Sequence, residues 1–233
     1  MMKAKPMQKV KTFLEKTPNA LLCVLGAVVF LAAFYFLRSR TPLDKIWLPT
    51  TMNNDEALYN RQVVSVITHG GPQGYFGYQE STADIGRFST WGPFLIWAYA
   101  IPGFLFGSSV NVVLWVNILF IALGIAVFAH SAKLSWWQCI VLCGTLFAVT
   151  QPISSCFSGA SEGLHYALTL VLIGGAIGME RTGKRGYFLL TVAACVLETI
   201  VRPYTLLFWV FPLMAIWKDK NNVTPALRLW RLV

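Results

Sequence analysis

Apolar runs long enough to cross a lipid bilayer recur along most of this 233-residue chain. Five of them precede residue 180, namely Leu21–Leu37, Trp91–Gly107, Val110–Ala129, Trp136–Val149 with an extension to Cys156, and Gly163–Met179. A longer run, Tyr187–Trp217, follows and is broken at Val201–Tyr204. A helix needs about 20 apolar residues to span the hydrocarbon core. The pattern therefore predicts an all-α polytopic membrane protein.

The composition agrees with this class and excludes others. Hydrophobic residues make up 56% of the chain and charged residues only 12%, which is about half the charged fraction of a soluble domain. The net charge of +9 is therefore a signal of membrane orientation instead of nucleic-acid binding. The five cysteines and three histidines show no metal-ligand spacing, so we expect buried thiols and no zinc site.

Lysine and arginine residues predict the orientation, because cytoplasmic loops of membrane proteins are enriched in them. Residues 1–20 hold five lysines against one glutamate, and the segments 180–186 and 218–220 are also basic. Placing all three in the cytoplasm requires an even number of crossings between them. We therefore predict about six transmembrane helices, with Trp91–Gly107 as a juxtamembrane or re-entrant segment on the outer side.

This orientation divides the chain into three parts. Residues 1–20 form a basic cytoplasmic N-terminus, residues 21–217 a transmembrane module with an outer loop at 38–109, and residues 218–233 a truncated cytoplasmic tail. The predicted location is the cell membrane, with multiple passes and the N-terminus in the cytoplasm. Arg38, Arg40 and Lys45 in the outer loop oppose this orientation, but the five N-terminal lysines and the two later basic segments together outweigh them.

The outer loop contains two adjacent carboxylates, Asp55 and Glu56, where an amphipathic pattern begins. Asn53 and Asn54 are good N-cap residues, and acids in a first turn complement the helix dipole. Apolar residues follow at helical spacing, namely Tyr59, Val63, Val66 and Ile67. Gly70–Pro72 ends the pattern, which predicts a helix lying on the outer membrane face. From position alone, ordinary capping is the simpler explanation of the two acids.

Three segments carry a resemblance to the polyprenyl-phosphate-sugar glycosyltransferases, which include the protein O-mannosyltransferases and bacterial relatives that modify lipid A with aminoarabinose. DEALYNRQVVSVITHGGP, residues 55–72, resembles the D-E-x-x-Y segment of their first outer loop. FSTWGPFLIWAYAIPGFLFGSS, residues 88–109, is similar to their juxtamembrane segment, with Trp91–Gly92–Pro93 where Lys-Pro-Pro is usual. SGASEGLHYALTL, residues 158–170, places Glu162 where the family has a second acidic residue.

The resemblance implies a GT-C-like module that moves a sugar from a polyprenyl-phosphate donor to an extracytoplasmic acceptor. It implies catalytic roles for Asp55, Glu56 and Glu162, with Asp55 as the first choice of general base. Substrate binding is expected of a second set of residues, namely Arg202, Tyr59, Arg61, Arg87 and Trp91. The resemblance leaves two possibilities for a cofactor, namely none or a divalent cation. Because the lysine of Lys-Pro-Pro is missing here, one contact expected with the donor phosphate is missing as well.

Arg202 lies at the predicted outer turn of the last apolar hairpin. An arginine in an apolar setting at membrane depth costs at least ~2.5 kcal/mol to insert, so a specific partner is expected. Two explanations stay open. Arg202 binds the donor phosphate, or it pairs with Glu198, four residues earlier on the same helix face.

Family members are typically about twice as long as this chain or longer, which bears on its expected partners. We expect contact with membrane lipid and a polyprenyl-phosphate sugar, and assembly with a second copy or a separately encoded C-terminal half, without nucleic acid. Two other interpretations stay open, a non-catalytic membrane subunit and a small transporter. The GGAIG segment at 174–178 predicts close helix packing instead of nucleotide binding.

Overall fold

The computed structural model describes residues 18–40, 54–72, 88, 92–109, 111–148 and 161–220. Within these residues it contains eight α-helices, one 3-10 helix and no strand. They are, in chain order, α2 (Asn19–Ser39), α3 (Asn54–His69), α4 (Gly92–Gly103), α5 (Val112–Ser131), α6 (Trp136–Ala148), α8 (Glu162–Thr182), α9 (Arg185–Val201), η3 (Pro203–Trp209) and α10 (Val210–Lys220). The prediction of an all-α fold is confirmed for the described part of the chain.

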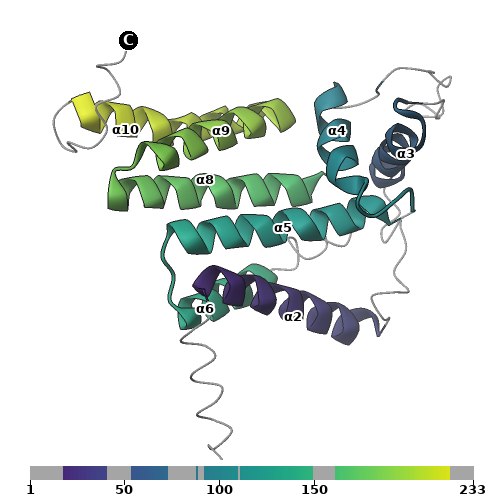
Figure 1. The fold of residues 1–233 in the computed structure, drawn as a ribbon, viewed down its shortest axis with the longest axis horizontal. Helices are drawn as coiled ribbons and strands as arrows, with labels where there is room; N and C mark the ends of the chain where they lie inside the picture. Colours follow the sequence, from purple (N-terminus) through teal and green to yellow (C-terminus); the bar gives the residue numbers. More distant parts are fainter. Residues whose placement is uncertain are drawn as a thin grey trace, which may run out of the picture.

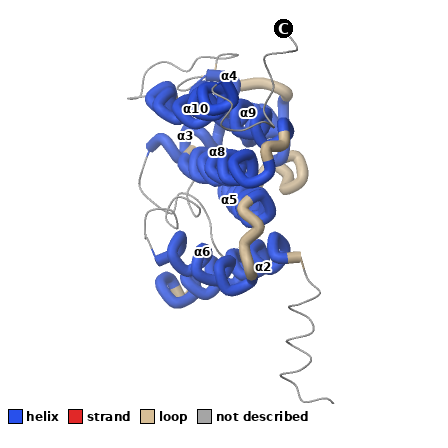
Figure 2. The backbone as a smooth tube through the Cα atoms, turned by 90° about the vertical axis from the view of Figure 1, so that its left-hand side faces the viewer, coloured by secondary structure: helices blue, strands red, loops and turns tan. Residues whose placement is uncertain are grey.

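The longer helices lie side by side in a layered stack (Figure 1). α2 and α6 form one outer layer, α5 packs on α2, α8 packs on α5, and α9 with η3 and α10 covers the far side of α8. The view turned by 90° shows the same order of layers (Figure 2). α5 and α8 are therefore the inner helices of the stack.

The sequence explains where α8 and α9 end. Gly183 follows α8 with a left-handed backbone, φ 61°, which glycine adopts without the steric cost of a Cβ. α9 ends at Val201 because Pro203 disfavours a helical backbone at the residue before it, and Arg202 is extended at φ −143° and ψ 97°. The predicted break of the last apolar run at 201–204 is confirmed.

Glycines let α5 and α8 approach each other backbone to backbone. A Cβ placed on Gly124 would lie 2.9 Å from the Cα and the carbonyl oxygen of Ala167, and one on Gly174 would lie 2.8 Å from the Cα of Phe128. Two more glycines of the 174–178 segment face α9 as closely, Gly175 and Gly178. The predicted packing role of this segment is confirmed.

Hydrogen bonds from α2 and α8 to the loop between α5 and α6 bring three parts of the chain to one end of the stack. Asn19 Nδ2 donates to the carbonyl oxygen of Leu134 at 2.5 Å, and the Arg181 guanidinium donates to the carbonyl oxygen of Ala132. This end carries four exposed cations, Lys133, Arg181, Lys184 and Arg185. We refer to it as the basic end.

α3 and α4 lie at the opposite end of the stack, here termed the α3–α4 end (Figure 1). One apolar cluster joins them to the first turns of α5 and α8 and to the last residue of α9. α4 has 12 residues and is therefore about 18 Å long, well below the ~30 Å of a bilayer core. α6 has 13 residues and is about as short, so the prediction that the 91–107 segment does not cross stays a prediction.

The packing of α3 differs from the prediction of a helix lying on the membrane face. Its apolar stripe, with Tyr59, Val63 and Val66, is buried in the cluster that α4 and α5 share. Glu56 and Gln62 are buried as well. α3 therefore packs a wide face against other helices of the protein, instead of presenting a narrow apolar stripe to lipid.

Two described helices, α5 and α8, are long and apolar enough to cross a membrane by length and composition. Shorter apolar helical stretches lie at Asn19–Phe30, Pro93–Gly103, Trp136–Leu146 and Pro203–Trp217. These findings are compatible with a membrane protein, and the six crossings stay a prediction.

We predict that Gly124→Ala and Gly174→Ala each destabilise the protein by about 1–3 kcal/mol, because the new methyl group meets backbone atoms of the facing helix. Gly144→Ala in α6 is the matched control, since a Cβ there meets nothing within 4 Å. The control should be neutral or stabilising, as alanine favours helix by up to ~1 kcal/mol. Thermal unfolding in detergent measures all three, and equal midpoints for the three variants would contradict the packing.

Candidate functional site

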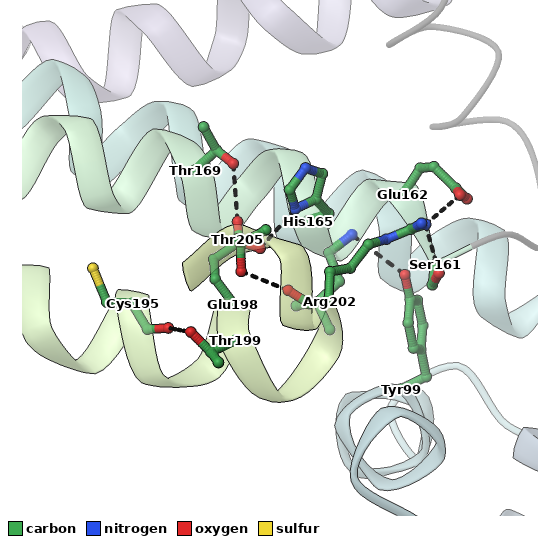
Figure 3. A network of polar contacts seen from close by, with 11 residues as sticks. Tyr99, Ser161, Glu162, His165, Thr169, Cys195, Glu198, Thr199, Arg202 and Thr205 are labelled. Carbon is green, nitrogen blue, oxygen red and sulfur yellow. Dashed lines mark hydrogen bonds and ion pairs between the residues drawn. The ribbon is translucent and has the colours of Figure 1, made fainter. Parts of the chain in front are cut away.

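Charged and polar side chains gather at the α3–α4 end, between the start of α8 and the α9–η3 break (Figure 3). Arg202 forms an ion pair with Glu162, and its NH2 group also donates to Ser161 Oγ at 3.2 Å. Both partners lie at the N-terminus of α8, and Arg202 lies where α9 ends. The pair therefore joins two helices at their ends.

The backbone of Arg202 is held on both sides of its Cα. Its N–H donates to the carbonyl oxygen of Glu198 at 2.7 Å. Its carbonyl oxygen accepts from Thr205, from the backbone N–H at 2.9 Å and from Oγ1 at 2.7 Å. The proline after Arg202 breaks the helix, and these bonds then fix the direction in which the side chain leaves it.

The Arg202 guanidinium keeps its charge in this setting. Burial lowers its pKa, but the neighbouring Glu162 carboxylate and the Tyr204 phenol raise it, and the pKa is raised on balance. The guanidinium carbon also lies 6.0 Å from the centroid of the Tyr204 ring, within the range of a cation–π contact. The site thus presents a permanent cation at the end of a helix.

Glu198 forms a second polar cluster with α8, deeper between the helices. The residue is fully buried, and both carboxylate oxygens are bonded, Oε2 to His165 Nδ1 at 2.6 Å and Oε1 to Thr169 Oγ1 at 2.9 Å. An ionised carboxylate only accepts hydrogen bonds, so it requires the histidine proton on Nδ1. The hypothesis that Arg202 pairs with the Glu198 side chain is wrong, because Arg202 bonds to Glu162 instead.

Tyr99 links α4 to the same region. Its hydroxyl donates to Asn117 Oδ1 at 2.6 Å and accepts from the backbone N–H of Leu164 at 3.3 Å. The Leu164 N–H belongs to the first turn of α8, where backbone donors have no partner within the helix. One phenol therefore satisfies a helix end and a buried amide, and it joins α4, α5 and α8.

A narrow crevice, too tight to hold a water molecule, lies beside these bonds. It is lined by Tyr59 and Val63 of α3, by three residues of α4 including Tyr99, by Val113 of α5, and by Ser161. Because Ser161 also accepts a hydrogen bond from Arg202, the crevice lies next to the ion pair. Its walls are mostly apolar, with the hydroxyl groups of Tyr59, Tyr99 and Ser161 as the polar exceptions.

The structure brings three of the predicted site residues to this region. Glu162 and Arg202 are in contact, and Tyr59 lines the crevice that Ser161 closes. Glu56 lies in the first turn of α3 and is buried, with 4% of its surface exposed. Arg61 is exposed and is not among the residues that line the crevice.

The remaining predicted site residues are not described in full. Asp55 lies in the first turn of α3, but its side chain is outside the described part of the structure. Arg87 and Trp91 lie outside the described residues altogether. Among the described residues, no group of three or more histidine, cysteine, aspartate or glutamate side chains is arranged to hold a metal ion.

Sequence reasoning missed Tyr99, Asn117 and Thr169. Asn117 offered the clearest signal, because it is the single amide within α5 and lies among apolar residues, and a buried amide needs a hydrogen-bond partner. Tyr99 and Thr169 gave none, since tyrosine and threonine are common in apolar helices. Their roles depend on which helices face each other.

Comparison with known proteins adds no relative. No protein-family model matches the chain, no curated protein resembles it significantly, and no solved structure does so either. The function must therefore be argued from the residues of the site.

We predict that Glu198→Ala destabilises the protein by about 3 kcal/mol, because it leaves His165 and Thr169 without their buried acceptor. Glu180→Ala is the matched control, since Glu180 is exposed at the other end of α8 and should cost less than ~1 kcal/mol. Thermal unfolding in detergent measures both variants. If the two midpoints shifted alike, Glu198 would hold no structural cluster together.

Proposed function

We propose that the chain is a membrane glycosyltransferase, or a part of one, that transfers a sugar from a polyprenyl-phosphate donor to an extracytoplasmic acceptor. The observation that carries the proposal is the Arg202–Glu162 ion pair beside the Tyr59–Tyr99 crevice. Such a transfer needs a cation for the departing phosphate, a carboxylate near the acceptor, and an apolar surface for the lipid. The proposal is supported by the position of Arg202, Glu162 and the apolar residues around Tyr59 and Tyr99 at one end of the stack.

The proposed reaction is a displacement at the anomeric carbon of the donor sugar. The acceptor hydroxyl oxygen forms the new bond to that carbon, the bond from the carbon to the phosphate oxygen breaks, and polyprenyl phosphate leaves with the electron pair. Arg202 stabilises the negative charge of the leaving phosphate. The hydroxyl proton passes to a carboxylate of the first turn of α3, with Asp55 as the first choice and Glu56 as the second.

The proposal also includes an orientation, with the α3–α4 end outside the cytoplasm. Four exposed cations at the basic end support it, since cytoplasmic ends of membrane proteins are enriched in lysine and arginine. The start of α2, which the lysine-rich residues 1–17 precede, lies at the same end. Six crossings by α2, α5, α6, α8, α9 and η3 with α10 would then alternate between the two ends.

One observation favours ion or proton transport as a second candidate function. Glu198 is fully buried and bonded to His165, and ionisable residues inside a membrane often belong to proton pathways. Both oxygens of Glu198 are nevertheless held by neighbouring side chains, as in a structural cluster. The partly exposed Arg202–Glu162 ion pair lies at the α3–α4 end. Its position favours a reaction at one face of the stack over transport through the stack.

The orientation predicts the side from which single cysteines react with a membrane-impermeant maleimide. Ser109→Cys, at an exposed position between α4 and α5, should react from outside the cell, and Lys184→Cys, at the basic end, only after the cells are opened. The unmodified chain gives the background, because its described cysteines are buried. Labelling of Ser109→Cys from the cytoplasmic side alone would overturn the orientation.

The function predicts different effects for the base and for the phosphate ligand. Asp55→Asn should abolish sugar transfer in membranes that contain the protein, yet leave the binding of farnesyl phosphate nearly unchanged, because a base acts after binding. Arg202→Gln should weaken that binding about tenfold, as expected for one lost charge-assisted contact.

Arg185→Gln is the control for a general loss of positive charge, since Arg185 is exposed at the basic end. It should leave both transfer and farnesyl phosphate binding unchanged. Normal transfer by Asp55→Asn would show that Asp55 only caps α3. Equal binding by Arg202→Gln and the unmodified protein would remove Arg202 from the donor site.

A further inference from the structure

We propose that Glu162 competes with the donor phosphate for Arg202, so that donor binding exchanges one anion for another on a fixed cation. The inference rests on the proposed function and adds the way in which the site is regulated. In the resting state the Glu162 carboxylate neutralises Arg202. When the phosphate binds, the carboxylate is released toward the space where the acceptor must lie.

The geometry makes Arg202 the fixed partner of the pair. Its backbone is bonded on both sides, to Glu198 and to Thr205, and its NH2 group is bonded to Ser161 as well as to Glu162. Its side chain is only 18% exposed. In the proposed exchange the phosphate takes the place on the NH2 group that the Glu162 carboxylate holds.

Glu162 is the exchangeable partner. Its side chain is 33% exposed, and only Oε1 bonds to Arg202. Oε2 is buried without a hydrogen-bond partner among the described residues, although a carboxylate oxygen in such a position is normally bonded. An under-bonded carboxylate gives up its place at lower cost than a fully bonded one such as Glu198.

The exchange explains how the site would select a lipid-linked phosphate. A free phosphate ion must displace Glu162 with its own charge alone. A polyprenyl phosphate also gains free energy when its apolar chain covers the crevice and the neighbouring apolar surface. The ion pair thus weakens the binding of anions that lack a lipid chain. It also sets an order of binding, with the donor before the acceptor.

A double-mutant cycle on farnesyl phosphate binding, measured at equilibrium without an acceptor, tests this competition. Glu162→Gln should strengthen binding about tenfold, because Arg202 is then available without exchange. Arg202→Gln should weaken binding, and the double variant Glu162→Gln/Arg202→Gln should bind as weakly as Arg202→Gln alone. Glu162→Ala serves in the same cycle if Glu162→Gln does not fold.

The cycle separates this inference from the proposed function. If Arg202→Gln weakens binding but the Glu162 variants do not strengthen it, the competition is wrong while the donor site stands. If Glu162→Gln strengthens binding equally with and without Arg202, the effect is general electrostatics and the competition is wrong as well. If Arg202→Gln has no effect on binding, both the donor site and the competition are wrong.

Discussion

The close approach of α5, α8 and α9 sets the position of the polar groups that α8 and α9 contribute to the candidate site. Gly124 and Gly174 bring the α5 and α8 backbones into direct contact, and Gly175 does the same for α8 and α9. Because a helix advances only about 1.5 Å per residue, such contacts fix the register between neighbours. That register places the first turn of α8 opposite the end of α9, where the ion pair forms.

The helix ends at this face meet because each end has donors or acceptors that its own helix cannot satisfy. Tyr99 takes up a backbone N–H from the first turn of α8, and Arg202 donates its own N–H to the last turn of α9. In a low-dielectric surrounding such bonds matter more than in water. The polar residues of the site thus also complete the ends of the helices, which ties the site to the fold.

Composition and periodicity predicted the helical class, the break at 201–204 and the packing role of the 174–178 glycines, because these are local signals. They did not predict that α3 packs on α4 and α5, since an amphipathic stripe looks the same whether it faces lipid or protein. The partner of Arg202 was missed for a similar reason. Glu198 is near in sequence, whereas Glu162 is near only after α8 and α9 have packed.

The two glutamates between α8 and α9 differ in how firmly their carboxylates are held. Glu198 is fully buried with both oxygens bonded, so any change there leaves donors unsatisfied and is costly. Glu162 keeps one oxygen on Arg202 and the other without a partner among the described residues, on a side chain that is 33% exposed. Only the second arrangement can exchange its cation at small cost. In the proposed function, Glu162 therefore takes part in the exchange on Arg202, whereas Glu198 supports the packing of α8 and α9.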